Sequence, residues 1–252
     1  MRMKPLCYCV VFVIVLLWAY ALNAVERITT AHFIVKYHEG GGYMGELVAK
    51  AAEDGFVDIA RKLGYTPDRS IRIVLAADDA EFDSLTMNEL PDWSAAVALS
   101  SDTIVLSPLA GQKIGIERIV RHETAHCFIE DAARGARVPR WFHEGCAEYV
   151  SGEIGVRGTA YIIIKTLRRE LMTFEDIEDV FSVGSEDAAL AYDQSLLAVN
   201  YLMSLNGPMV LGVILSRMAE GEDFEHAFLV ATGVTAIEFE KSCLAHIRDT
   251  YG

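Results

Sequence analysis

The sequence predicts an α+β fold, with a small N-terminal sheet lobe followed by a helical C-terminal lobe. Short apolar segments typical of strands alternate with helical segments between residues 25 and 106, and the apolar spacing is helical from Gln112 onward. The chain has 252 residues, of which 52% are hydrophobic, so it can bury a substantial core. We expect one domain over residues 25–252, with lobes at 25–111 and 112–252.

The first 24 residues have the order of a secretory signal peptide. Met1–Pro5 is short and basic, Leu6–Ala21 contains no charge, and small residues follow up to Ala24. The apolar run is near the lower length limit for crossing a bilayer, so an uncleaved membrane anchor through residues 6–21 is the alternative. Both interpretations place the body outside the cytoplasm, secreted or periplasmic.

The first lobe is expected to contain strands and one long helix. Residues 28–37 alternate well enough for a strand, and residues 43–63 have helical spacing that ends at Gly64, a typical C-terminal cap. The glycines between them form a loop. The remaining expected elements are a strand at 71–76, one or two helical turns at 79–85, and a hairpin at 95–106 that turns at residues 100–102.

The second lobe is expected to be entirely helical. Glycine and proline interrupt the pattern, for example at Gly207-Pro208. The acidic run at residues 175–179 is interpreted as a solvated loop. The expected helices cover residues 113–131, 140–151, 159–171, 186–205, 208–220, 223–231 and 235–249.

Charge and cysteine content exclude two kinds of protein. The formal net charge of −14 argues against a nucleic-acid partner, because such binding depends on Lys and Arg neutralising phosphates. Beyond the N-terminal segment the chain has three cysteines, Cys127, Cys146 and Cys243. This odd, small number does not suggest a disulfide framework, and three buried thiols are expected.

The segment IVRHETAHCF (119–128) carries the clearest chemical signal. His122 and His126 are four residues apart, so on a helix their imidazoles lie on one face and can bind one metal ion. Glu123 projects beside them, where it can take a proton from a water on that ion. The alternative is a helix with two partly buried, hydrogen-bonded histidines.

A third ligand is expected from the segment VPRWFHEGCAEY (138–149). Glu144 and Glu148 also share a helical face, and a turn after His126 would return the chain antiparallel and bring Glu144 to the metal. Glu148 is then placed to orient a ligand histidine. His143 could bind the metal instead, but it points about 100° away from Glu144 on a helix, so it is interpreted as a substrate contact.

These two motifs resemble those of the gluzincin metallopeptidases, the thermolysin-like superfamily, and in particular its small peptidase MA-like members. The pattern W-x-x-E-G-x-A is also similar to that of zinc aminopeptidases, in which the glutamate is the third ligand. Residues 190–249 resemble the C-terminal helices of the MA-like proteins, and residues 71–82 resemble part of their N-terminal lobe. His143 departs from the small residue or Asn that usually precedes the ligand glutamate.

The resemblance implies a thermolysin-like zincin fold, a Zn²⁺ cofactor, Glu123 as general base and the hydrolysis of peptide bonds. It also implies that Ala96, Val97 and Ala98 lie on the sheet edge along which a peptide substrate pairs. Tyr192 is a candidate for the hydroxyl that stabilises the oxyanion, the alternative being a helix tyrosine packed against Trp141.

Three functions are compatible with these observations. The first is an exported zinc metallopeptidase acting on peptides or proteins, an endopeptidase because the sequence has no G-x-M-E-N-like stretch to anchor a free amine. The second is a non-catalytic zinc-stabilised or substrate-holding module with the same fold. The third is a membrane-anchored interaction domain. The presence of Glu123 favours the first, because a structural zinc site has no use for a base.

Overall fold

The computed structural model describes residues 25–87, 95–110, 115–152, 156–183 and 187–252. The strands are β1 (Val25–Thr29), β2 (Phe33–His38), β3 (Ile71–Leu75), β4 (Ala96–Ser100) and β5 (Thr103–Leu106). The helices are α2 (Gly42–Leu63), α3 (Asp79–Leu85), α4 (Ile116–Ala133), α5 (Arg140–Ser151), α6 (Val156–Leu167), α7 (Phe174–Val183), α8 (Ala188–Asn206), α9 (Val210–Ala219), α10 (Phe224–Thr232) and α11 (Ala236–Tyr251).

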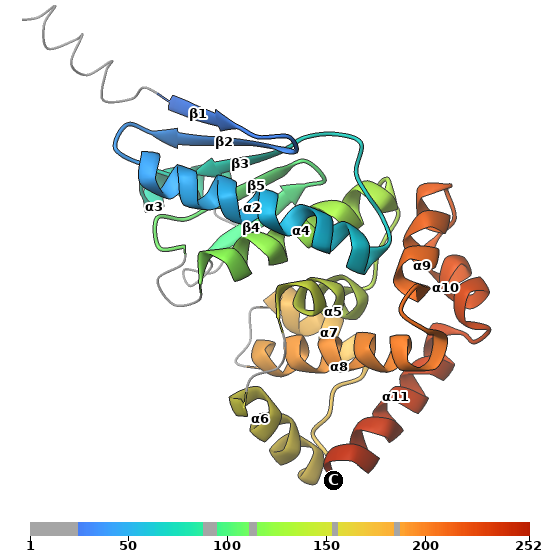
Figure 1. Cartoon of the computed structure of the whole chain (residues 1–252). Coiled ribbons are helices and arrows are strands. Elements are labelled where there is room, and N and C mark those ends of the chain that lie inside the picture. Colours follow the sequence, from blue (N-terminus) through green and yellow to red (C-terminus); the bar gives the residue numbers. More distant parts are fainter. Residues whose placement is uncertain (1–24, 88–94, 111–114, 153–155, 184–186) are drawn as a thin grey trace, which may run out of the picture.

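The five strands form one mixed sheet in the order β1-β2-β3-β5-β4. The central pairs β2–β3 and β3–β5 are parallel, whereas β1 and β4 pair antiparallel with their neighbours and form the two edges. The sheet and α2 form the upper part of Figure 1, helices α5 to α8 and α11 lie below them, and α9 and α10 lie at the right. The edge strand β4 contacts α4, so one edge of the sheet lies beside that helix.

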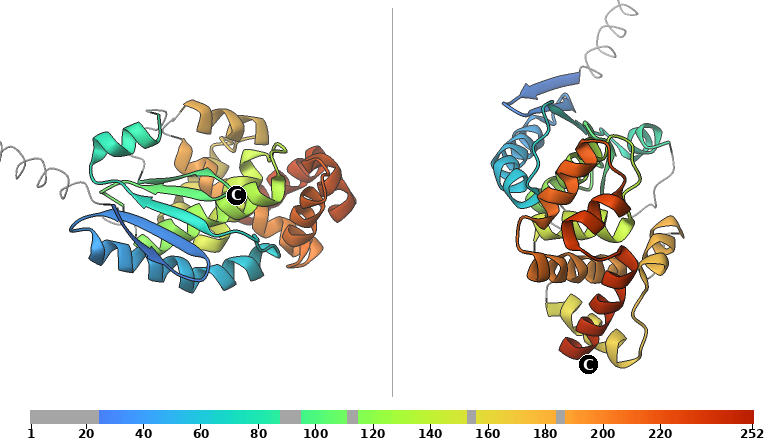
Figure 2. Two further views of the ribbon diagram at one scale, coloured as in Figure 1. Left: turned by 90° about the horizontal axis from the view of Figure 1, so that it is seen from above. Right: turned by 90° about the vertical axis from the view of Figure 1, so that its right-hand side faces the viewer.

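The two faces of the sheet are covered differently. Alternating side chains of β3 and β5, such as Ile73 and Ile104, are buried in the main core with α2 and α4. Val105 points to the other face and packs with Phe82 of α3 in a smaller cluster. Figure 2 shows α2 and α3 on opposite sides of the sheet. The face that contacts the main core is therefore the one that supports α4.

An aromatic cluster organises the helical part. Trp141 of α5 is 2% exposed and stacks on Phe174 of α7, with ring centroids 4.3 Å apart. Phe228 of α10 and Phe239 of α11 also contact the Trp141 ring. Since Trp141 lies three residues before Glu144, this cluster fixes the start of the helix that carries the predicted ligand.

The α+β fold with a small N-terminal sheet and a helical remainder is confirmed. The helix predicted at 140–151 has these bounds in the structure, and Gly64 caps α2 with φ 64° and ψ 21° in the left-handed region. The three cysteines Cys127, Cys146 and Cys243 are free and buried, as expected.

Two element predictions are wrong. The single strand predicted at 28–37 is a hairpin, β1 and β2, because the backbone turns at residues 30–32, where the Thr30 N–H donates to the Phe33 carbonyl at 2.9 Å. The acidic run at 175–179 belongs to α7 instead of a loop. Thr173 caps this helix by exchanging hydrogen bonds with Asp176, and Ile177 is fully buried. Residues 1–24 and the expected lobe boundary near residue 111 lie outside the described residues.

Within the described part of the chain, no single helix is both long and apolar enough to cross a membrane. The pair α8 and α9 meets the length and composition limits only when joined across a bend of 99°.

Candidate metal centre

Two histidines of α4 face the same point. His122 and His126 are one turn apart, their ring centroids are 4.7 Å apart, and their Nε2 atoms are separated by 3.1 Å. The helix ends at Arg134, which takes the left-handed conformation and whose N–H donates to the Glu130 carbonyl. This end lets the chain reverse into α5 within a few residues.

Helix α5 returns the third side chain to the same point. Pro139 stands at its N-terminal cap, a position that needs no backbone N–H donor. Glu144 is 5% exposed, and its Oε2 lies 3.5 Å from Nε2 of His122 and 3.3 Å from Nε2 of His126. Although buried, this oxygen accepts no hydrogen bond within the described residues. The structure therefore brings His122, His126 and Glu144 together.

The triangle of these three atoms fits a tetrahedral zinc ion. Zinc binds His nitrogen and carboxylate oxygen at about 2.0–2.1 Å, which places tetrahedral ligand atoms about 3.4 Å apart. The three edges of 3.1, 3.3 and 3.5 Å are close to this value. Two nitrogens and one oxygen are also a donor set that zinc accepts, with the fourth position left for water or substrate.

Glu148 lies behind His122 in a chain of three charged side chains. Its Oε1 is 3.3 Å from Nδ1 of His122, and its Oε2 accepts a hydrogen bond from Arg118 at 2.8 Å. This contact orients the His122 ring with Nε2 toward the triangle. Sequence reasoning placed Glu148 here but missed Arg118. The signal was available, because Arg118 is four residues before His122 and lies on the same helical face.

The electrostatics of the site favour a cation. Burial alone would lower the pKa of His122, but its close contacts with the Glu144 and Glu148 carboxylates and the nearby charge of Glu123 raise it to about 10. Burial alone would raise the pKa of Glu144, yet the charge of His126 and the contacts with both histidines hold it well below its usual value. A field that stabilises positive charge at His122 also favours a divalent ion.

Glu123 connects α4 to the edge strand β4. Its side chain is largely buried, and its Oε2 accepts a hydrogen bond from the Ala98 N–H at 2.8 Å. The carboxylate is thus held between the sheet edge and the histidine triangle. The other carboxylate oxygen receives no such bond from the described residues.

The three predicted edge residues do not have equivalent positions. The Ser107 N–H donates to the Ala95 carbonyl, so by antiparallel alternation the peptide groups of Val97 face β5 and those of Ala96 and Ala98 face away. Val97 also packs its side chain against the smaller cluster. Only Ala96 and Ala98 therefore direct peptide groups to the outer edge of the sheet.

Tyr192 lies beside the histidines. Helix α8 packs along α5 and places the Tyr192 ring 6.1 Å from that of His122. Burial and the charges of Glu144 and Glu123 raise the pKa of Tyr192 above its ordinary value, so its hydroxyl keeps its proton. A protonated hydroxyl at this position is a hydrogen-bond donor.

His143 has a buried position. Its ring stacks on His126 with centroids 4.4 Å apart and an angle of 18°, and its side chain is 11% exposed. Nε2 of His143 lies 3.3 Å from Oε1 of Glu130. Sequence reasoning did not identify Glu130, although it lies four residues after His126. Little of the His143 surface is left for the predicted substrate contact.

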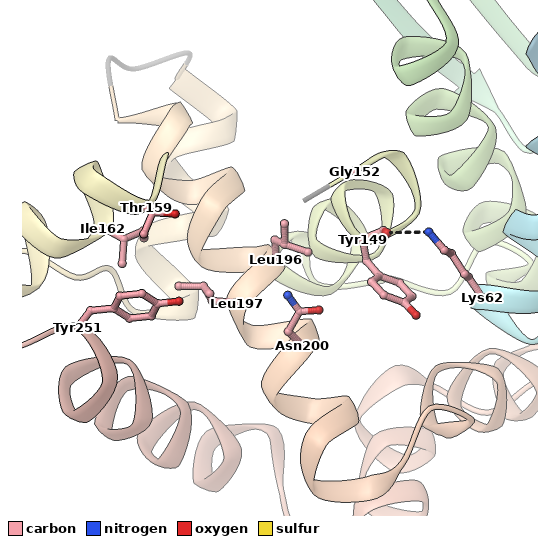
Figure 3. Close-up of a pocket in the computed structure, with 9 residues that line it drawn as sticks. All are labelled: Lys62, Tyr149, Gly152, Thr159, Ile162, Leu196, Leu197, Asn200 and Tyr251. Atoms are coloured by element: carbon pink, nitrogen blue, oxygen red, sulfur yellow. Dashed lines mark hydrogen bonds between the residues drawn. The ribbon is translucent and has the colours of Figure 1, made fainter. Parts of the chain in front are cut away.

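A cavity of about 400 Å³ lies at the other end of α5 and is separate from this site. Tyr149, Asn200 and Tyr251 line it together with Lys62, whose Nζ donates to the Tyr149 carbonyl at 3.4 Å (Figure 3). Lys62 also pairs with Asp58, so its charge is already compensated. None of the metal-centre residues lines this cavity.

Comparisons with a family model and with solved structures gave matches. A family model described as the peptidase MA superfamily matches residues 51–248. Two solved structures, both of a mutant two-domain M1 zinc metallopeptidase, bound to L-arginine and to L-tryptophan, are similar with TM-scores of 0.47 and 0.45. Each is 18% identical, and the match covers 89% of this chain and 51% of that chain, so the chain spans about half their length. No curated protein matches the chain.

The family model covers well over half of the chain, and the site has a donor set that a zinc ion accepts. The chain therefore belongs to the peptidase MA superfamily, which confirms the resemblance seen in its two motifs.

Proposed function

We propose that this protein is an exported zinc-dependent endopeptidase that hydrolyses peptide bonds with an activated water. The observation that carries the proposal is the triangle of His122, His126 and Glu144 with Glu123 beside it. A purely structural zinc site would need four protein ligands and no adjacent base.

His122, His126 and Glu144 would hold the zinc ion. When bound, zinc lowers the pKa of a water molecule and polarises a carbonyl oxygen. Glu123 would accept the proton of that water through its free carboxylate oxygen and pass it to the leaving amine. The hydrogen bond from the Ala98 N–H fixes the direction of this carboxylate.

Tyr192 would donate its hydroxyl hydrogen bond to the oxygen that becomes negatively charged during attack. Its raised pKa supports this role, because the hydroxyl remains a donor across the working pH range. Its ring centroid lies 6.1 Å from that of His122, which supports this role.

The substrate would be an extended peptide that pairs with the outer edge of β4. Ala98 has its carbonyl on that edge, and its N–H already contacts the base, so a peptide aligned there would pass the reacting groups. The absence of a G-x-M-E-N-like stretch in the sequence supports cleavage within a chain instead of removal of an N-terminal residue.

Export rests on residues 1–24 alone. Expression of the full chain followed by N-terminal sequencing tests it. We expect a mature N-terminus near Val25, or an intact N-terminus in the membrane fraction if the segment is an anchor. Protein found in the cytosol with Met1 retained would contradict export.

The activity is tested with purified protein, by elemental analysis and a peptide-library cleavage assay. We expect about one zinc per chain and cleavage that a chelator abolishes and zinc restores. Zinc without cleavage of any peptide would support the second candidate, a zinc-stabilised module with the peptidase fold. Absence of zinc from the purified protein, together with no gain of zinc on addition, would reject both.

A further inference from the structure

We propose that His143 is a positioning residue, whose stacked ring holds His126 with its Nε2 toward the metal site. The inference rests on the proposed function, since it concerns the support of a proposed zinc ligand. It differs from the sequence prediction, in which His143 was a substrate contact.

The two ligand histidines are supported unequally. A histidine that binds a metal usually donates its second ring N–H to a carboxylate or carbonyl, which fixes the ring direction. Glu148 serves His122 in this way at 3.3 Å. Nδ1 of His126 is buried and has no hydrogen-bond partner among the described residues. The ring of His126 must be held by something else.

The His143 ring provides that support by stacking. It lies nearly parallel to the His126 ring, at 18° and 4.4 Å, while His122 meets His126 edge-on at 86°. Rotation of the His126 ring about its Cβ–Cγ bond would drive it into the His143 face. Because His143 precedes Glu144 on α5, the stack also connects two of the three proposed ligands across the helix pair.

Glu130 faces the outer nitrogen of the supporting ring within ion-pair distance, although this nitrogen makes no hydrogen bond among the described residues. It is four residues after His126, so it lies on the same face of α4, and its Oε1 is 3.3 Å from Nε2 of His143. The contacts that lead from His126 to His143 and on to Glu130 resemble those that lead from His122 to Glu148 and on to Arg118. In the first series a ring takes the place of the carboxylate.

The test is the zinc dissociation constant of the full chain, measured by competition with a chromophoric chelator. His143→Ala removes the stacking face and should weaken zinc binding by about 10- to 100-fold. His143→Phe keeps a flat ring at the same place and should stay within about threefold of wild type. His246→Ala is the matched control, because His246 also stacks on an aromatic ring, that of Tyr201, with centroids 4.3 Å apart. This substitution should leave zinc affinity unchanged.

A second readout is the visible absorption of the cobalt-substituted protein, which reports ligand geometry. We expect His143→Ala to change this spectrum and His143→Phe to preserve it. Zinc affinity and spectrum that are both unchanged in His143→Ala would overturn the positioning role, as would an equal loss of affinity in His143→Phe and His143→Ala. A wild type that binds no zinc would instead refute the proposed function.

If His143→Ala does not fold, Glu130→Ala decides the matter. The Glu130 side chain is 46% exposed, so its removal should leave the fold intact. We expect a smaller loss of zinc affinity, of about two- to threefold, as in His143→Phe, which also lacks the contact with Glu130. A Glu130→Ala variant that binds zinc as tightly as wild type would overturn the proposed positioning role.

Discussion

At the scale of single residues, the metal centre depends on side chains that are not ligands themselves. Glu148 fixes His122, and the Ala98 N–H fixes Glu123. Each contact removes a rotational freedom from a group that must point at one position. Among residues that are not proposed ligands, those that make these contacts are therefore expected to affect zinc binding and activity most when substituted.

Glu148→Ala should weaken zinc binding by about 10- to 100-fold without abolishing it, because the three ligands remain while His122 loses its support. Chelator competition measures the change. Glu222→Ala is the control, since it also removes a carboxylate paired with an arginine, Arg217, and is expected to change nothing. Complete loss of zinc in Glu148→Ala with retention in Glu144→Ala would show that the two carboxylates have the opposite roles.

We expect the ionisation of Tyr65 to lower the free energy of unfolding at alkaline pH. Burial and a hydrogen bond of 2.8 Å to Asp131 raise the pKa of Tyr65 from 10 to about 12. The folded state therefore favours the neutral phenol. This stabilisation is complete below pH 10 and is lost as the pH rises toward 12, a loss of at most about 2 to 3 kcal/mol.

Urea unfolding at pH 9 and pH 11 checks the prediction by comparing wild type with Tyr65→Phe. The free energy of unfolding of wild type should fall more between the two pH values than that of the variant, which cannot ionise. Equal pH slopes in the two proteins would rule out this role for Tyr65.

At the scale of elements, the contact between α5 and α8 positions the third ligand. A Cβ at Gly145 would lie 2.4 Å from the Ser195 carbonyl oxygen and 2.7 Å from Cγ2 of Val199. Only glycine allows the two helices to approach this closely. The glycine that follows Glu144 is thus explained by packing, which the motif alone did not reveal.

Gly145→Ala should destabilise the protein by about 3 kcal/mol or more, because backbone of α8 must move. It should also weaken zinc binding, since Glu144 is the adjacent residue. Gly42→Ala is the control: its Cβ would make only an ordinary contact at 3.9 Å in the first turn of α2. Thermal unfolding and chelator competition measure both effects, and a Gly145→Ala variant as stable as Gly42→Ala would refute the close approach.

The helices and the convergence of three candidate ligands could be predicted from sequence because both depend on regular spacing. His122, His126 and Glu144 lie on faces that α4 and α5 fix by periodicity. Contacts that depend on tertiary packing could not be read in the same way. The stack of His143 on His126 and the bond from Ala98 to Glu123 join residues whose relative orientation no local pattern specifies.

The hairpin at β1 and β2 and the helix α7 were missed for related reasons. The turn at residues 30–32 has no glycine or proline to mark it. The acidic residues at 175–179 form the exposed face of α7, while Ile177 is fully buried against the other helices. The apolar residues Phe174, Ile177 and Val180 do have helical spacing, so this helix was missed because the acidic run was considered without its neighbours.

At the scale of the whole molecule, the metal would join the sheet edge and two helices. Removing it leaves Glu144 and His126 buried without the ion that their arrangement fits. At a zinc concentration about a thousand times its dissociation constant, binding adds about 4 kcal/mol of stability. For a chain of this size, chelation should lower the melting temperature on the order of 10 °C.

Differential scanning calorimetry with and without chelator measures this shift. Glu144→Ala, which lacks one proposed ligand, should show a much smaller shift than wild type. A melting temperature of wild type that is insensitive to both chelator and added zinc would contradict a metal at this position.

The most direct test of the central claim compares zinc content and peptide hydrolysis in wild type and Glu123→Gln. The substitution keeps the shape of the side chain and an acceptor for the Ala98 N–H, but it removes the base. We predict nearly unchanged zinc content and folding, with hydrolysis reduced by about 100- to 10,000-fold. If wild type cleaves peptides and Glu123→Gln cleaves them equally well, the mechanism is wrong even when both proteins contain zinc.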